Sequence, residues 1–147
     1  MRREFAILSI NVSDRTGVQK KPVARAVLRE GHGIEGDAHA GNWHRQVSLL
    51  ADEDIQTMRG RGVELGPGDF AENVTTRGID LGALPIGTLL NLGTALLEIT
   101  QIGKECRHHG CAIFHAVGDC VMPRKGVFAR VLRGGGIDNE SRCHYDL

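Results

Sequence analysis

Short apolar segments separated by glycines set the pattern of hydrophobic and polar positions along the chain. In ALLEITQIG, apolar Leu97 and Ile99 alternate with polar neighbours, which is the period of a strand buried on one face. Other segments rich in β-branched and apolar residues have the same strand-like character. We predict strands within residues 4–13, 22–30, 45–50, 73–81, 87–92, 95–103 and 127–132. The fifth and sixth of these are expected to pair across Gly93 and Thr94.

One helix is predicted in DEDIQTMR, residues 52–59, because acidic side chains fill its first turn, where the helix dipole favours them, and glycines follow it. A second short helix is predicted for CAIFHAV, residues 111–117. Many short strands with glycine turns indicate a mostly β protein whose sheet closes on itself or forms a sandwich. The glycine-rich RGGGIDNE, residues 133–140, predicts a tight corner, since it lacks the lysine of a phosphate-binding loop.

Length and charge narrow the function classes. A chain of 147 residues predicts a single domain spanning 1–147. Eighteen basic residues balance eighteen acidic ones and aromatic residues are scarce, so neither an attractive field nor a stacking platform for nucleic acid is expected. No apolar run approaches the roughly 20 residues of a membrane helix, and the N-terminal segment reads as a strand and not as a signal peptide. We therefore expect a cytoplasmic protein with no nucleic-acid or membrane partner.

Three of the four cysteines and three of the seven histidines gather in GKECRHHGCAIFHAVGDC, residues 103–120. In a reducing cytosol, cysteines are more often catalytic or metal-binding than paired in disulfides. Cys106 is the candidate reactive residue, because cationic neighbours stabilise the thiolate, which is the reactive form. These neighbours are Lys104, Arg107, His108 and His109.

Two other interpretations of this stretch stay open. Buried packing is one, since free cysteine is a common core residue. A zinc site is the other, although the cysteine spacing lacks the two close pairs of most structural zinc sites. Its ligands would be Cys106, His108 or His109, Cys111 and Cys120.

The remaining cysteines carry separate expectations. Cys143 lies in the polar C-terminal tail beside His144, so we expect it to be exposed and to be the chief rival of Cys106 in reactivity. Cys111 and Cys120 flank the apolar AIFHAV and are expected to be buried.

The segment GIEGDAHAGNWHRQVSLL, residues 33–50, is a candidate binding loop. Glycines bracket Asp37 and His39, which share a face if the chain is extended, and Arg45 leads into an apolar strand. Such a loop at a strand entrance suits a polar or anionic ligand. A solvated loop with turn glycines fits the same residues equally well.

A second candidate is GPGDFAENVTTRGIDL, residues 66–81, in which Asp69, Glu72 and Asn73 follow a Pro–Gly corner. Asx side chains often bond the backbone of their own turn, and this is the favoured role for Asp69. Asn73 precedes a strand, and its amide is suited to contact a heterocycle. Alone, this signal is weak.

Taken together, these segments resemble the MOSC domain family, the module named for the C-terminal part of molybdenum-cofactor sulfurases. The matching pieces are in the family's order and cover the chain from about residue 4 to 137. They are GIEGDAHAG with HRQVSLL, GDFAENVTTRGIDL, LPIGTLLNLG, LLEITQIGKEC and VMPRKGVFARVLRGG. The resemblance is closest to the short, stand-alone bacterial branch. It implies a closed or nearly closed β-barrel with a mixed sheet and a few short helices.

The resemblance also implies which residues act. Cys106, which follows the strand-like LLEITQIG, matches the family position that carries sulfur as a persulfide or contacts the metal of a molybdenum cofactor. GIEGDAHAG and Asn73 match positions that line the same pocket. A molybdopterin ligand carries a phosphate and a dithiolene, so its pocket needs backbone amides and cations. The expected cofactor-binding residues are Gly36, Asp37, His39, Arg45, Asn73, Arg124 and Lys125, with Cys106 as the catalytic residue and the metal ligand.

The leading hypothesis is therefore a sulfur-carrier or sulfurtransferase domain that binds the molybdenum cofactor. A separate cysteine desulfurase, which uses pyridoxal phosphate, would be the sulfur donor. Molybdenum-cofactor biosynthesis proteins or molybdenum enzymes would be the other partners. Two alternatives stay open: reduction of N-hydroxylated compounds at the bound cofactor, with an electron-donating partner, and a non-catalytic interaction module stabilised by zinc.

Overall fold

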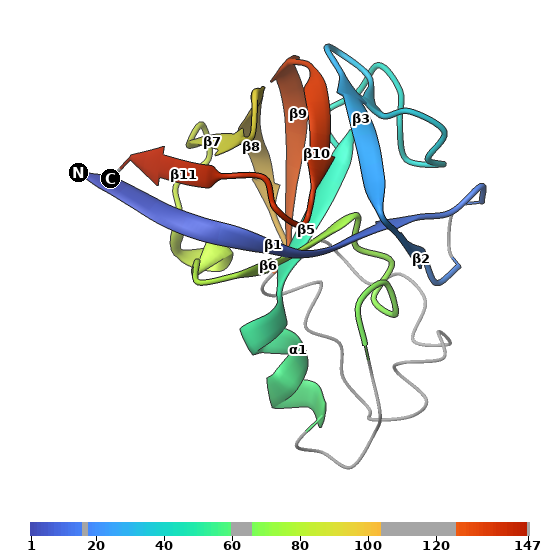
Figure 1. The fold of residues 1–147 in the computed structure, drawn as a ribbon, viewed down its shortest axis with the longest axis horizontal. Helices are drawn as coiled ribbons and strands as arrows, with labels where there is room; N and C mark the ends of the chain where they lie inside the picture. The colour runs from blue at the N-terminus through green and yellow to red at the C-terminus, as the bar shows by residue number, and fades with distance from the viewer. Residues whose placement is uncertain (16–17, 60–65, 104–125, 147) are drawn as a thin grey trace.

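A closed β-barrel dominates the computed structural model, which describes residues 1–15, 18–59, 66–103 and 126–146 (Figure 1). Within these residues, seven strands are hydrogen-bonded in the order β11-β7-β8-β9-β5-β6-β1, and β11 pairs with β1 to close the ring. The elements are β1 (Arg2–Val12), β2 (Lys21–Val23), β3 (Arg25–Arg29), β4 (Gly33–Ile34), β5 (Val47–Ala51), α1 (Asp52–Arg59), β6 (Val74–Arg77), the 3-10 turn η1 (Leu81–Ala83), β7 (Leu89–Leu92), β8 (Ala95–Ile102), β9 (Val127–Arg133), β10 (Gly135–Asp138) and β11 (Cys143–Asp146).

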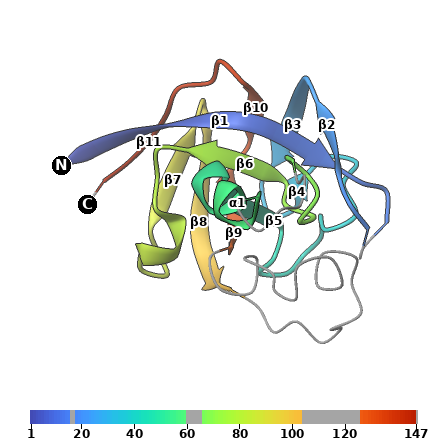
Figure 2. The same cartoon turned by 90° about the horizontal axis from the view of Figure 1, so that it is seen from below.

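The barrel sheet is mixed because one neighbouring pair is parallel. β5 runs parallel to β6, with Leu49 opposite Val74, whereas the other barrel pairs are antiparallel. Parallel neighbours need a crossover connection, and α1 begins it. Ile55 of α1 is completely buried, and Figure 2 views this helix nearly along its axis in front of the barrel strands. In the described residues, no helix has the length and apolar character needed to cross a membrane.

The strand β1 is long because it has three partners. Its first residues pair with β11, its middle pairs with β6 and its last residues pair with β2. The register against β6 shifts between Ile7 and Ser9, and such a bulge bends a strand. A second sheet of three strands, in the order β10-β3-β4, lies against the barrel. The loop that follows β4 therefore begins beside the barrel.

An apolar core fills the barrel interior and extends to the second sheet, with Leu28 of β3, Ile34 of β4 and Ile137 of β10. On β8, Leu97 and Ile99 are completely buried, whereas Glu98 between them makes an outer ion pair with Arg130 of β9 at 2.7 Å. Burial of one such aliphatic side chain contributes about 1.5–3 kcal/mol. The cluster comprises Phe5, Ile7, Ile10, Leu28, Ile34, Val47, Leu49, Val74, Ile79, Leu81, Leu84, Leu90, Leu92, Ala95, Leu97, Ile99, Val127, Ala129, Val131, Ile137, Cys143 and Tyr145.

The prediction of a mostly β protein with a closed mixed barrel is confirmed. Every strand predicted from the apolar pattern overlaps an observed strand, and α1 has the predicted bounds. β7 and β8 pair as an antiparallel hairpin across Gly93 and Thr94, as expected. The helix predicted at 111–117 lies outside the described residues.

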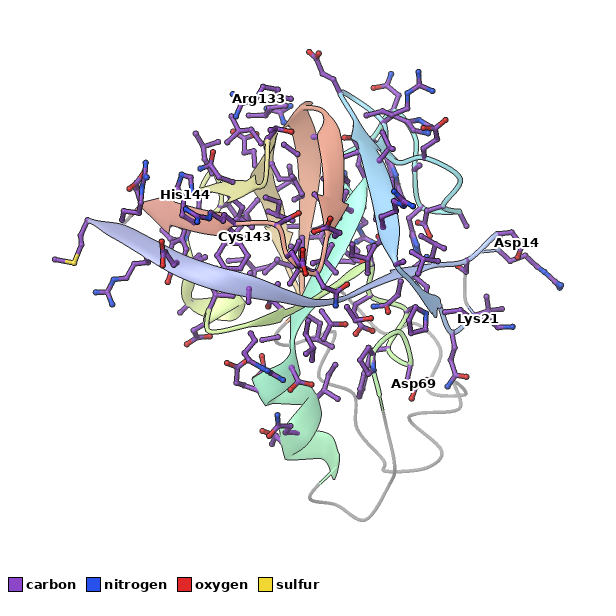
Figure 3. All side chains as sticks on the ribbon, viewed as in Figure 1. Asp14, Lys21, Asp69, Arg133, Cys143 and His144 are labelled. Carbon is purple, nitrogen blue, oxygen red and sulfur yellow. The ribbon has the colours of Figure 1, made fainter. Side chains whose placement is uncertain are left out.

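The C-terminal region differs from the prediction. Gly135–Asp138 is strand β10, paired with β3, and not a tight corner. Glycine is needed beside it, because a Cβ on Gly134 would lie 2.6 Å from the carbonyl oxygen of Leu28. The polar tail is strand β11, which completes the barrel. Cys143 on this strand (Figure 3) is 3% exposed, so the prediction of an exposed thiol is wrong.

Candidate functional site

A close backbone approach at Gly33 of β4 and the turns of the following loop hold this segment in place. Gly33 has φ +124°, and a Cβ there would lie 2.5 Å from the backbone oxygen of Gln46. Backbone bonds from Asp37 to Ile34 (3.1 Å) and from Gly41 to His32 (2.8 Å) fold the loop back on itself. The loop is therefore pre-formed next to the entrance of β5.

Asp37 anchors this loop through a buried ion pair. Its Oδ1 accepts hydrogen bonds from Lys20 Nζ at 2.8 Å and from the Ser13 amide at 3.0 Å. Its Oδ2 accepts the backbone amide of His39 at 3.0 Å. Both side chains of the ion pair are completely buried, and Lys20 Nζ also donates to Ser13 Oγ at 3.0 Å. Loss of one partner from such a pair leaves a buried charge and typically costs about 3–5 kcal/mol.

The pKa of Asp37 lies below its ordinary value. Burial alone would raise this pKa, but the hydrogen bonds outweigh it, with Lys20 contributing most and Ser13 next. The side chain of Asn73 and the His39 amide also lower it. The structure therefore brings together three predicted site residues: Asp37 and His39 from the loop after β4, and Asn73, which directly precedes β6. At neutral pH Asp37 is a carboxylate whose charge is matched by Lys20.

His39 extends this cluster toward the surface. Its Nδ1 lies 3.8 Å from Asp37 Oδ2, and its side chain is 17% exposed. Its backbone oxygen accepts a hydrogen bond from Trp43 Nε1 at 2.8 Å. His39 thus connects a fully buried ion pair to an exposed aromatic ring.

Asn73 holds three strands together at one end of the barrel. Its Oδ1 accepts bonds from the Ser48 amide (2.9 Å) and hydroxyl (3.1 Å) on β5. Its Nδ2 donates to the Asn11 carbonyl of β1 at 3.2 Å, and the Asn11 amide donates to the Asn73 carbonyl at 2.6 Å. The amide is therefore engaged with protein groups. The expectation that it contacts a heterocycle stays a prediction.

Glu72, next to Asn73, is a fully buried carboxyl to which no role of its own was assigned from the sequence. Its Oε2 accepts the Thr75 hydroxyl at 2.6 Å, while Asn11 Nδ2 contacts Thr75 Oγ1 at 3.1 Å. Burial raises the pKa of Glu72, and the Thr75 hydroxyl, with backbone amides including those of Gly68 and Phe70, offsets only part of that effect. Glu72 thus differs from Asp37, since no salt bridge to it is found among the described residues.

The turn before Glu72 follows the sequence prediction. Asp69 Oδ2 accepts the Gly66 amide at 2.7 Å, the turn-forming role expected for this side chain. Figure 3 shows Asp69 on this turn, below Lys21 at the start of β2. The Lys20 amide donates to the Gly68 carbonyl at 2.9 Å. The turn thereby fixes the backbone of the lysine that neutralises Asp37.

Gln101, near the end of β8, links Arg45 of the binding loop to Gly103, the last described residue before the connection from β8 to β9. Its Oε1 accepts Arg45 Nε at 3.0 Å and contacts His44 Nε2 at 2.8 Å. Its Nε2 donates to the Gly103 carbonyl at 2.7 Å, and the Gly103 amide donates to the Gly126 carbonyl at 2.6 Å. Sequence reasoning missed Gln101, because a glutamine on the outer face of a strand carries no distinguishing signal.

Ser48, Phe128 and Gln101 lie side by side on three neighbouring strands. Ser48 of β5 stands opposite Phe128 of β9, and Phe128 stands opposite Gln101 of β8. The Arg45 guanidinium lies 5.1 Å from the centroid of the Phe128 ring, within the range of a cation–π contact. Asn73 and Gln101 are therefore at the same end of the barrel, where β8 ends and β9 begins.

Cys106 belongs to the connection between Gly103 and Gly126 and lies outside the described residues. The same holds for Arg124, Lys125 and the two other cysteines of that connection, so the expected convergence of Cys106 with His39 and Asn73 stays a prediction. The described residues do contain groups that fit a phosphate-bearing cofactor. Arg45 offers a guanidinium, and Gly36 is exposed with nothing within 4 Å of the position that a Cβ would take. A ligand can therefore approach the Gly36 backbone closely.

Comparison with known proteins identifies the family. The model of the MOSC domain matches residues 36–142. The chain belongs to the MOSC domain family. The matched residues include the binding loop from Gly36 onward, Asn73, Gln101 and the connection that carries Cys106. No curated protein matches the chain in sequence.

Solved structures share the whole fold of this MOSC domain. The YuaD protein from Bacillus subtilis has a TM-score of 0.83 and 20% identity, covering 99% of this chain and 97% of that one. YiiM from Geobacillus stearothermophilus has a TM-score of 0.72 and 23% identity, with coverage of 97% and 75%. YiiM from Escherichia coli has a TM-score of 0.66 and 18% identity, with coverage of 100% and 70%. At these identities, the likeness concerns the fold.

Proposed function

We propose that this MOSC domain binds a molybdenum cofactor at the barrel end where β8 terminates, and that Cys106 carries sulfur there for the maturation of molybdenum enzymes. Family membership supports the cofactor class. The observation that carries the location is the Arg45–Gln101–Gly103 chain of hydrogen bonds, which links the binding loop to the base of the connection that bears Cys106. We further propose that the protein acts in the cytosol, where thiols are kept reduced.

Different residues of the chain would bind the phosphate, approach the ligand and position the loop. Arg45, Arg124 and Lys125 would hold the phosphate by charge-assisted hydrogen bonds, and the open backbone at Gly36 would approach the ligand. Asp37 and Asn73 would position the loop, since both are engaged in internal hydrogen bonds. The cofactor, when bound, would supply the molybdenum and the dithiolene to which sulfur chemistry is directed. Cys106 would face it as a thiolate or a persulfide.

The sulfur step that we propose balances without an added oxidant. The Cys106 thiolate attacks the outer sulfur of a persulfide on a cysteine desulfurase, whose own cofactor is pyridoxal phosphate. A new S–S bond forms at Cys106, and the S–S bond of the donor breaks to release the donor thiolate. Cys106 is thereby oxidised to a persulfide while the donor is reduced to a thiol. The cationic side chains next to Cys106 in sequence favour the thiolate that begins this step.

The cofactor half of the proposal is tested by purifying the protein from a host that makes the molybdenum cofactor, followed by metal and pterin analysis. We expect molybdenum and pterin to copurify with the wild type and to be reduced in Arg45→Gln. Arg133→Gln is the matched control, because Arg133 is an exposed arginine of β9 whose Nε also bonds an acceptor of the protein, the Thr94 carbonyl at 2.9 Å. Stoichiometric zinc without pterin would contradict the proposal and favour the interaction module.

A further inference from the structure

Three consecutive residues and one glutamine form a fixed row on the surface beside the candidate site. We call Trp43, His44, Arg45 and Gln101 the Trp43 row. Trp43 is 44% exposed, yet its indole N–H is held by the His39 carbonyl at 2.8 Å. Its ring meets the His44 ring nearly edge-on, with centroids 6.1 Å apart. An aromatic ring that is both exposed and anchored offers a stacking surface at low entropic cost.

The hydrogen bonds of Gln101 determine which ring nitrogen of His44 acts as a donor. An arginine Nε always carries a hydrogen, so the atom of Gln101 that meets Arg45 is the amide oxygen. The opposite end of the same amide donates to the Gly103 carbonyl, which agrees with this orientation. His44 Nε2 contacts the same oxygen and must therefore carry a hydrogen as well. In its neutral form His44 thus leaves Nδ1 as the acceptor on its other edge.

Arg45 is oriented by two contacts that leave its terminal nitrogens available. Nε is bound to Gln101, and the guanidinium lies over the Phe128 ring at 5.1 Å. Among the described residues, no hydrogen bond or ion pair engages the two terminal nitrogens. Such a fork binds carboxylate or phosphate in a bidentate manner. The row therefore combines an aromatic surface with a pre-oriented anion receptor.

We propose that the Trp43 row binds a planar aromatic ring that carries an anionic group, with the ring stacked on Trp43 and the anion on the Arg45 fork. The inference deepens the proposed function and rests on it for the natural ligand. Two sources share this chemistry: the pterin of the cofactor, with its phosphate, and an aromatic anion brought as substrate. Trp43 is the stacking residue, Arg45 is the anion-binding residue, and Gln101 is a positioning residue that orients Arg45 and His44.

Calorimetric titration of the full chain with pterin-6-carboxylate tests this proposal. The comparison ligands are 6-hydroxymethylpterin (the ring without the charge), inorganic phosphate (the charge without the ring) and 2-naphthoate (another ring with a charge). We expect the two ligands with both features to bind more tightly than the other two. Preference for pterin-6-carboxylate over 2-naphthoate points to the cofactor as source, and comparable affinities point to an aromatic substrate. Equal binding of all four ligands, or of none, overturns the proposal.

Variants separate the two contributions. Trp43→Ala should weaken binding of pterin-6-carboxylate roughly 5- to 10-fold, the size expected for one aromatic contact, and leave phosphate binding unchanged. Arg45→Gln should remove the preference for charged ligands, and Arg45→Lys, which keeps the charge without the fork, should restore only part of it. Arg133→Gln is the control and should bind like the wild type. Because the chain has one tryptophan, its fluorescence, corrected for ligand absorbance, should be quenched by ring ligands and not by phosphate.

The outcomes also separate this inference from the proposed function. If molybdenum and pterin copurify to the same level with Trp43→Ala and the affinity for pterin-6-carboxylate is unchanged, the assignment of the Trp43 row is wrong and the cofactor proposal stands. If neither molybdenum nor pterin copurifies while aromatic anions still bind through Trp43 and Arg45, the row is a ligand site and the cofactor proposal is wrong.

Discussion

Lys20 Nζ lies 2.8 Å from Asp37 Oδ1, and both side chains are completely buried. The pair joins the segment after β1 to the loop after β4. Because Asp37 also accepts the His39 amide, the ion pair holds the backbone of His39 in place. Ser13 satisfies both members, through its amide to the carboxylate and its hydroxyl to the ammonium. The stability of the fold should therefore depend strongly on this ion pair.

The first prediction concerns removal of one member of this pair. Asp37→Asn should lower the free energy of unfolding by about 3–5 kcal/mol, because Lys20 would be left buried without its counter-ion. Lys20→Met together with Asp37→Leu should cost much less than the sum of the single changes. Urea unfolding measures both. The exposed pair Arg29–Glu35, at 3.8 Å, supplies the control, and Arg29→Met should have little effect. Strict additivity at Lys20 and Asp37 would contradict the ion-pair account.

The second prediction concerns Glu72 and pH. Its pKa in the folded state is raised above the ordinary value of 4.5, chiefly by burial. The folded state therefore binds the proton more tightly than the unfolded state, so stability falls as pH rises from the unfolded pKa through the raised one. Glu72→Gln removes the charge and should abolish this loss. We expect the variant to match the wild type in acid and to be more stable at neutral pH. Parallel stability curves from urea unfolding across pH would show that Glu72 does not titrate in this way.

Asp37 supplies the opposite sign in the same experiment. Its folded-state pKa is lowered from the ordinary value of 3.8. Its contribution to stability is therefore present above that value and is lost as pH falls through the lowered pKa. Wild type and Glu72→Gln should both show this loss in acid, whereas Asp37→Asn should not.

The third prediction compares two glycines with nearly the same backbone conformation. Gly68 has φ +87° and Gly36 has φ +86°. A Cβ at Gly68 would lie 2.1 Å from the Lys20 carbonyl oxygen, whereas a Cβ at Gly36 would meet nothing within 4 Å. Alanine at Gly36 should cost only the backbone strain, about 1–2 kcal/mol. Alanine at Gly68 should cost more, because the Lys20 backbone must also move. Equal losses in the two variants, measured by thermal or urea unfolding, would contradict the close approach.

The fourth prediction concerns the one cysteine that the structure describes. Burial raises the pKa of Cys143 to about 11, so the thiol is protonated at neutral pH and shielded from reagents. Alkylation followed by peptide mass mapping should leave Cys143 unmodified in the native protein and modified in urea. Native modification of Cys143 at the rate of an exposed thiol would contradict its place in the barrel interior.

Period-two patterns predicted the fold well where both faces of a strand differ in polarity. β8 is the clearest case, since Leu97 and Ile99 face the core while Glu98 faces outward. The prediction of an exposed C-terminal tail was wrong for a physical reason. In CHYD of β11 the buried positions are Cys143 and Tyr145, which read as polar, and their burial depends on partners in β1 and β7 that are distant in sequence.

The candidate site was predictable in part. Asp37, His39 and Arg45 were selected from one loop, and the structure adds the partners that position them. Lys20 was missed because KK followed by proline reads as a solvated corner, and Gln101 was missed because its role exists only through Arg45 and Gly103. Buried ion pairs and tertiary hydrogen bonds join residues far apart in the chain, so no local sequence pattern predicts them.

Persulfide loading of Cys106 tests the central claim most directly. The protein is incubated with a cysteine desulfurase, cysteine and pyridoxal phosphate, and the sulfur on each cysteine is mapped by mass spectrometry after trapping. Cys143→Ala serves as the matched control, because this buried thiol has no role in the account. We predict one added sulfur on Cys106 in the wild type and in Cys143→Ala, and none on the protein in Cys106→Ala. Full loading of Cys106→Ala, or loading of another cysteine in its place, would contradict the account.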